Sequence, residues 1–116
     1  MKTLSKDDIL GVEDLETEKV KVPEWGGVVI LRELKGSERD TFEEGSLDKN
    51  RNVSMANMRA RLVALSAVDD KGERLFSAKD AVKLGSKSAS ALDRLFEVAC
   101  RLSGITDRDV EDLEKN

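Results

Sequence analysis

Hydrophobic residues along the chain form two helical patterns, one in the middle and one near the C-terminus. Over residues 53–68, apolar side chains recur every three or four positions, at Met55, Met58, Leu62 and Leu65. This spacing places them on one face of an α-helix, whereas Arg59, Arg61 and Ser66 fall off that face. A second pattern of the same kind covers residues 87–103. We therefore expect two main helices, over residues 53–68 and 87–103.

An alternating pattern predicts a β-hairpin before these helices. Residues 16–22 alternate between polar and apolar side chains, and residues 28–34 begin with a β-branched run. The intervening Pro-Glu-Trp-Gly-Gly contains a proline that ends strand pairing and glycines that permit a turn. Trp25 in this turn has two interpretations. The favoured interpretation is that the Trp25 side chain covers the apolar face of the hairpin. The other is that Trp25 is exposed and recognises a protein partner.

Short capped segments separate these elements. Ser or Thr followed three residues later by Asp can mark a helix start, and we interpret four such pairs in this way: Ser5–Asp8, Ser37–Asp40, Ser77–Asp80 and Thr106–Asp109. A two-stranded ribbon is marginal unless its apolar face is covered, and the two main helices are the long elements available to cover it. The sequence therefore predicts an α+β fold: one mostly helical domain over residues 1–116, with the hairpin packed on the two main helices.

Composition narrows the possible functions. Charged residues make up 38% of the chain with both signs intermixed, and 24 acidic against 20 basic residues give a net charge of −4. This balance argues against nucleic acid as a partner, because phosphate binding needs clustered Lys and Arg. We expect no membrane segment, since no apolar run approaches about 20 residues. The charged N-terminus does not fit a signal peptide, so the expected location is cytoplasmic.

The residue types that carry most enzymatic chemistry are missing. The chain has no histidine and one cysteine, Cys100, so neither a metal site nor an activated nucleophile is predicted, and no cofactor is expected. Asp69 and Asp70 precede a glycine, but Lys71 and Arg74 occupy positions where calcium would need oxygen ligands. The Gly-Ser-Lys-Ser at residues 85–88 lacks the earlier glycine of a phosphate-binding loop. The sequence leaves open only a pair of carboxylates acting in general acid–base catalysis.

Two methionines are candidates for protein binding. Met55 and Met58 either fill the core or form an adaptable apolar surface. The core interpretation is favoured, because both continue the stripe of Leu62 and Leu65. Together with Trp25, they are the candidate protein-interaction residues of the sequence.

The order of several short motifs resembles that of tail assembly chaperones from long-tailed, siphovirus-type bacteriophages or prophages. The resemblance covers nearly the whole chain. Its motifs are V-P-E-W-G-G at 22–27, R-E-L at 32–34, G-S-E-R-D-T-F at 36–42, R-A-R-L-V-A-L-S at 59–66, D-D-K-G-E-R-L-F at 69–76 and A-L-D-R-L-F-E-V-A at 91–99.

This resemblance implies a role in viral morphogenesis without catalysis. Such chaperones bind the tape measure protein, keep it soluble and help to recruit tail tube subunits. They act in the bacterial host cytoplasm and are absent from the mature virion. The family commonly makes a longer product by ribosomal frameshifting, which implies a second form able to contact the tail tube protein. We also expect self-association along the tape measure. The alternative is a non-enzymatic regulatory adaptor with no tail-assembly role, and an enzyme ranks third.

Overall fold

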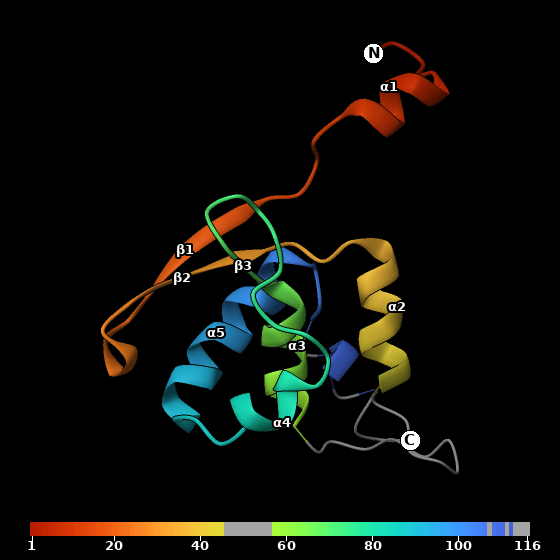
Figure 1. The fold of residues 1–116 in the computed structure, drawn as a ribbon. Helices are drawn as coiled ribbons and strands as arrows, with labels where there is room; N and C mark the ends of the chain where they lie inside the picture. Colours follow the sequence, from red (N-terminus) through yellow and green to blue (C-terminus); the bar gives the residue numbers. More distant parts are fainter. Residues whose placement is uncertain (46–56, 107, 111, 113–116) are drawn as a thin grey trace.

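The computed structural model describes residues 1–45, 57–106, 108–110 and 112 (Figure 1). The helices are α1 (Lys6–Gly11), α2 (Gly36–Gly45), α3 (Met58–Ser66), α4 (Asp80–Leu84) and α5 (Ala89–Leu102). The strands are β1 (Thr17–Val22), β2 (Gly27–Arg32) and β3 (Ala67–Val68), and the 3₁₀ turn η1 (Pro23–Trp25) joins β1 to β2.

The three strands form one antiparallel sheet in the order β1-β2-β3. In the hairpin, Val20 pairs with Val29 and Val22 with Gly27. The third strand was not predicted, because its residues continue the helical pattern of the sequence. The helix α3 ends at Ser66, where the backbone turns extended and pairs with the free edge of β2. Pairing with β2 therefore overrides the local helical periodicity of these two residues.

A tight turn after β3 completes this edge of the sheet. The Asp69 carboxylate accepts hydrogen bonds from the backbone N–H groups of Lys71 at 2.8 Å and Glu73 at 3.0 Å. Gly72 takes a φ of +83°, which a side chain would disfavour. The Leu75 N–H then donates to the Ala67 carbonyl at 3.1 Å. These aspartate contacts fit the predicted turn.

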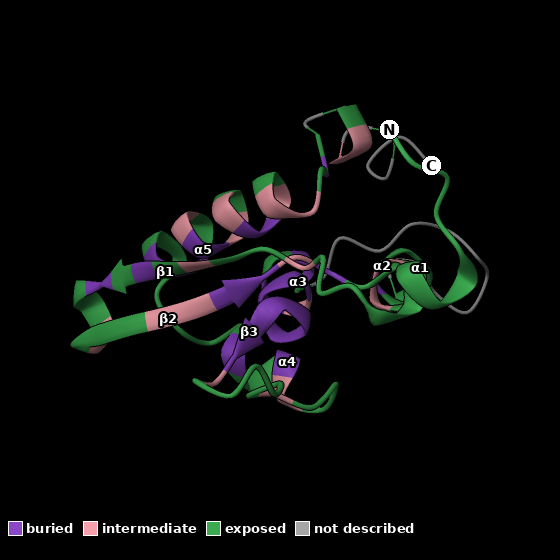
Figure 2. Ribbon diagram, turned by 90° about the horizontal axis from the view of Figure 1, so that it is seen from above, coloured by how far each residue is buried: buried purple, intermediate pink, exposed green. Residues whose placement is uncertain are grey.

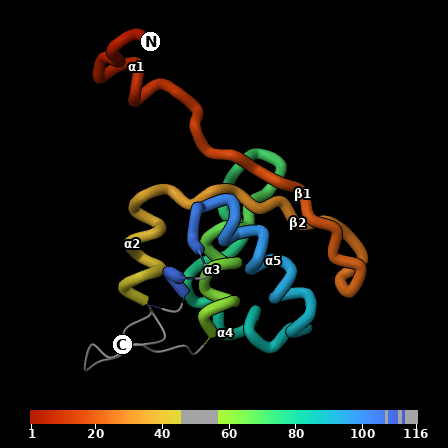
Figure 3. Tube along the Cα trace, turned by 180° about the vertical axis from the view of Figure 1, so that it is seen from behind, coloured from red at the N-terminus to blue at the C-terminus, as the bar shows by residue number. Residues whose placement is uncertain are grey.

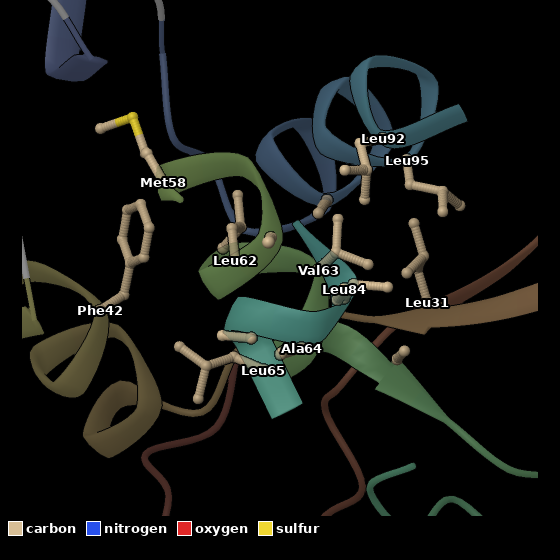
Figure 4. Close-up of a cluster of buried hydrophobic side chains, with 14 of the residues drawn as sticks. Leu31, Phe42, Met58, Leu62, Val63, Ala64, Leu65, Leu84, Leu92 and Leu95 are labelled. Atoms are coloured by element: carbon tan, nitrogen blue, oxygen red, sulfur yellow. The ribbon is translucent and has the colours of Figure 1, made fainter. Parts of the chain in front are cut away.

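The central helix α3 is surrounded by the other elements (Figure 2). Its side chains meet Phe42 of α2, Leu84 of α4, Leu92 of α5 and Leu31 of β2 in one apolar cluster (Figure 4). The sequence predicted burial of a single face, with Ser66 outside it. That expectation was wrong for Ser66, which is fully buried, because neighbours cover the helix from several sides.

The amphipathic helix α5 packs along α3 and also contacts both strands of the hairpin. It begins where the Ser88 hydroxyl accepts from the Ala91 N–H at 3.2 Å. Two residues past its end, Gly104 takes a φ of +67°, and the Ile105 N–H donates to the Cys100 carbonyl at 2.9 Å. The predicted α+β class, mostly helical with a hairpin on two main helices, is confirmed.

The predicted helix caps differ in outcome. Ser5 with Asp8 forms a complete capping box, and so does Thr106 with Asp109. At the third pair, the N–H and hydroxyl of Ser77 both donate to the Asp80 carboxylate. The Ser37–Asp40 prediction was wrong. The helix α2 starts one residue before Ser37. Glu38, three residues after Lys35, therefore takes the capping role, and its carboxylate accepts from the Lys35 N–H at 2.8 Å.

A largely buried ion pair joins the sheet to α2. Arg32 is 8% exposed, and its Nη2 donates to both carboxylate oxygens of Glu38, at 2.7 and 2.9 Å. The same guanidinium donates to the carbonyls of Glu33 and Gly72 at 3.3 Å. One side chain therefore connects β2, α2 and the turn after β3, with most of its donors satisfied.

Replacing Glu38 by alanine is expected to destabilise the protein strongly. The change leaves the Arg32 charge without its carboxylate in a largely buried site, which costs about 3 kcal/mol of unfolding free energy. Chemical denaturation followed by circular dichroism measures this loss. The control is Glu43→Ala, which removes the exposed partner of Arg39, with an expected cost below about 0.5 kcal/mol. Equal losses in the two variants would contradict the role of the buried pair.

Candidate protein-interaction surfaces

The described residues offer concave and apolar surfaces on which another protein could bind. Within them, no group of three or more His, Cys, Asp or Glu side chains is placed to hold a metal ion. No helix in the same part of the chain has the length and apolar character needed to cross a membrane. Concave and apolar patches at the protein surface are the candidate protein-interaction sites.

The first candidate is a groove of about 450 Å³ between the start of α3 and the start of α5, which we call the Met58 groove. Its lining residues come from α3, from the turn after α4 and from α5: Asn57, Met58, Arg59, Ala60, Gly85, Lys87, Ala89, Leu92 and Asp93. Arg59 and Asp93 form an ion pair, and the Arg59 guanidinium lies 5.9 Å from the centroid of the Phe96 ring. The groove thus combines an apolar base with a charged rim.

Only part of the predicted methionine site falls within this groove. Met58 is 5% exposed and lies in the same buried cluster as Phe42 (Figure 4), as the favoured core interpretation requires. It can offer a partner only the small surface that lines the groove. Met55 lies outside the described residues. Its contact with a partner, like that of Met58, stays a prediction.

The predicted Trp25 site is at the tip of the hairpin, in η1. Trp25 is half-buried and packs against the core cluster, which fits the favoured interpretation. Beside it, Glu24 accepts two hydrogen bonds from the Arg94 guanidinium, at 2.8 and 2.9 Å. This bidentate pair holds the hairpin tip against α5.

The helix α5 lies between the two predicted sites. Asp93 pairs with Arg59 at the Met58 groove, and the next residue, Arg94, pairs with Glu24 at the hairpin tip. Trp25 does not belong to the residues that line the groove. The structure therefore connects Trp25 and Met58 through one helix without placing them in one pocket.

The ion pair at the hairpin tip changes the acidity of Glu24. Hydrogen bonds from Arg94 are the main reason that the pKa of the Glu24 carboxyl falls from its ordinary value of 4.5 to about 2. The same contact raises the pKa of Arg94. Folding therefore stabilises the charged form of Glu24 relative to its neutral form.

This shift predicts how stability responds to acid. A carboxyl whose pKa is lower in the folded state stabilises the fold above its unfolded pKa, and that contribution is lost as the pH falls from about 4.5 to about 2. Glu24→Gln should therefore be less stable than the wild type at pH 7, with the difference shrinking toward pH 2. Denaturation measured at several pH values tests this, with Glu97→Gln on the exposed side of α5 as control. A difference independent of pH would contradict it.

Sequence reasoning did not identify two further apolar surfaces. One is a shallow depression beside α4, lined by Leu75 and Phe76 and flanked by Lys83 and Lys87. The other is the N-terminal arm, residues 1–16, with exposed apolar side chains at Leu4, Ile9, Leu10 and Val12. The sequence signal for the arm was a capped turn too short to be stable alone.

Comparison with known proteins identifies the class to which this α+β scaffold belongs. Residues 12–116 match the model of the family described as phage tail assembly chaperone. The fold is similar to the structure of the bacteriophage HK97 tail assembly chaperone, with a TM-score of 0.60 and 25% sequence identity over 83% of this chain and 88% of that chain. No curated protein sequence gives a significant match.

The chain therefore belongs to the phage tail assembly chaperone family. The resemblance inferred from the order of the motifs is confirmed. The segment shared with the family begins at Val12, so α1 precedes it.

Proposed function

We propose that this chaperone binds the tape measure protein, keeps it soluble before the tail is built, and helps to recruit tail tube subunits. It does so by binding alone, without catalysis or a cofactor, in the host cytoplasm, and it leaves before the virion is complete. The observation that carries this proposal is the family match over residues 12–116. A longer, frameshifted form would contact the tail tube protein, and copies would self-associate along the tape measure.

The Met58 groove is the proposed contact for the tape measure protein. A partner made largely of amphipathic helix docks by laying its apolar face into a groove. Met58 and Leu92 supply apolar surface at the base, and Arg59, Lys87 and Asp93 supply charges at the rim. Met55 and Trp25 are proposed as additional contacts.

Two neighbouring positions on α5 test this groove. Ala89 and Ser90 are both exposed in the first turn of the helix, but only Ala89 lines the groove. Glutamate is tolerated in a first helical turn because it complements the helix dipole, so both variants should fold. Met58→Asp is a poorer test, since a carboxylate at this buried position would destabilise the protein itself.

The experiment is co-expression with the tape measure protein of the same genome, followed by pull-down and light scattering. The wild-type chain and Ser90→Glu should keep the tape measure soluble in a multi-copy complex. Ala89→Glu should reduce the recovered complex at least tenfold, which corresponds to about 1.4 kcal/mol of binding free energy.

Two results would contradict these proposals separately. If Ala89→Glu and Ser90→Glu both retain the tape measure, the contact lies elsewhere on the chaperone. If the wild-type chain leaves the tape measure insoluble, the tape measure proposal itself fails, and the adaptor interpretation replaces it.

A further inference from the structure

The Met58 groove adjoins a second hollow at a single lysine. Lys87 lines the groove, and it also lines the shallow depression beside α4, which has a volume of about 360 Å³ and which we call the α4 depression. The residues that line the α4 depression are Leu75, Phe76, Asp80, Lys83, Leu84 and Lys87. The turn that joins α4 to α5, near the bottom of Figure 1, therefore carries the side chain at which the two hollows meet.

The α4 depression adds exposed apolar surface to that of the groove. Met58 and Leu92 in the groove are each 5% exposed, whereas Leu75 in the α4 depression is 50% exposed. Phe76 is partly buried and packs against the core cluster. Val82 is 69% exposed but lines neither hollow. A partner that filled the groove alone would leave Leu75 in water.

The charges around the two hollows are unequal. Asp93 pairs with Arg59, and the Asp80 carboxylate already accepts two hydrogen bonds within its own turn, at 2.9 and 3.1 Å. Among the described residues, Lys83 and Lys87 form no ion pair. The two linings together hold three basic and two acidic side chains, although the whole chain has a net charge of −4. This face is therefore locally basic.

We infer that the Met58 groove and the α4 depression form one surface for an acidic amphipathic helix. The apolar face of the helix covers both hollows, and its carboxylates lie beside Lys83 and Lys87. The inference rests on the proposed function and deepens it, because it names the chemistry of the partner segment that the groove accepts. Lysines beside an apolar hollow favour a segment with carboxylates along its apolar face and repel a basic one.

The N-terminal arm is the other acidic and apolar element that could compete for this surface. Its two lysines are outnumbered by five acidic residues: Asp7, Asp8, Glu13, Asp14 and Glu16. All six residues of α1 are exposed, and Figures 1 and 3 show the arm at the opposite end of the protein from α4. The arm of the same copy therefore leaves the surface open to a partner helix.

Binding of two synthetic peptides to the purified full-length chain tests the inference. Both peptides have about 20 residues, enough for an isolated helix, and the same leucine face. One carries glutamates along the flanks of that face and the other carries lysines. Fluorescence anisotropy at low salt should show that the wild type binds the glutamate peptide about fivefold more tightly than the lysine peptide. The net charge of the chain, −4, would by itself give the opposite order.

Two pairs of variants locate the contact. Lys87→Glu should lose the preference for the glutamate peptide and should bind the lysine peptide more tightly than the wild type does. Its control is Lys79→Glu, which should behave like the wild type because Lys79 is exposed at the start of α4 but lines neither hollow. Leu75→Asn should weaken binding of the glutamate peptide about tenfold, because the peptide buries this side chain. Val82→Asn should leave binding unchanged. Circular dichroism confirms that each variant is folded.

Four results would overturn the inference. The first is equal affinity of the wild type for the two peptides, or no binding of either. The second is an unchanged preference in Lys87→Glu. The third is wild-type binding by Leu75→Asn, which would confine the helix to the groove. The fourth is tighter binding of the glutamate peptide by Leu10→Asp than by the wild type, which would show that the N-terminal arm already occupies the surface.

The peptide measurements contain no tape measure protein, so their outcome is separate from that of the co-expression experiment. If the peptide preference is absent while co-expression yields a soluble complex, the inference fails and the proposed function stands. If the preference is present while the tape measure stays insoluble, the surface accepts an acidic helix and the tape measure proposal fails.

Discussion

Burial of α3 is the constraint on which the rest of the structure depends. The helix is only nine residues long, and most of its side chains, including the hydroxyl of Ser66, are buried. A helix that is apolar around most of its circumference needs neighbours on several sides. The helices α2, α4 and α5 and the sheet supply them, and each is positioned by what it covers. These neighbours partly bury even the charged Arg61 side chain of α3, and this burial lowers its pKa.

Features that depend on nearby residues were predictable from the sequence. The hairpin, the amphipathic pattern of α5 and the capping boxes at Ser5 and Thr106 all arise from side chains within a few positions of one another. The end of α3 was not predictable in this way. Ala67 and Val68 fit a helix by periodicity, and only the open edge of β2, more than 30 residues earlier, turns them into a strand.

The candidate site shows the same limit. The sequence singles out Met58 and Trp25 as apolar residues, but it does not show which apolar residues line a surface. The Met58 groove joins residues from α3 and α5 that lie about 30 positions apart, so no local pattern marks it. Because no metal-ligand or nucleophile motif marks a site in the sequence, the order of its motifs, rather than any one residue, indicated the chaperone family.

The adjacent ion pairs on α5 have a mechanical consequence. Asp93 and Arg94 project about 100° apart around the helix, toward α3 and the hairpin tip respectively. Rotation or sliding of α5 would therefore strain both contacts together. The two pairs therefore fix the rotation of α5 about its own axis against two surfaces that share no lining residue.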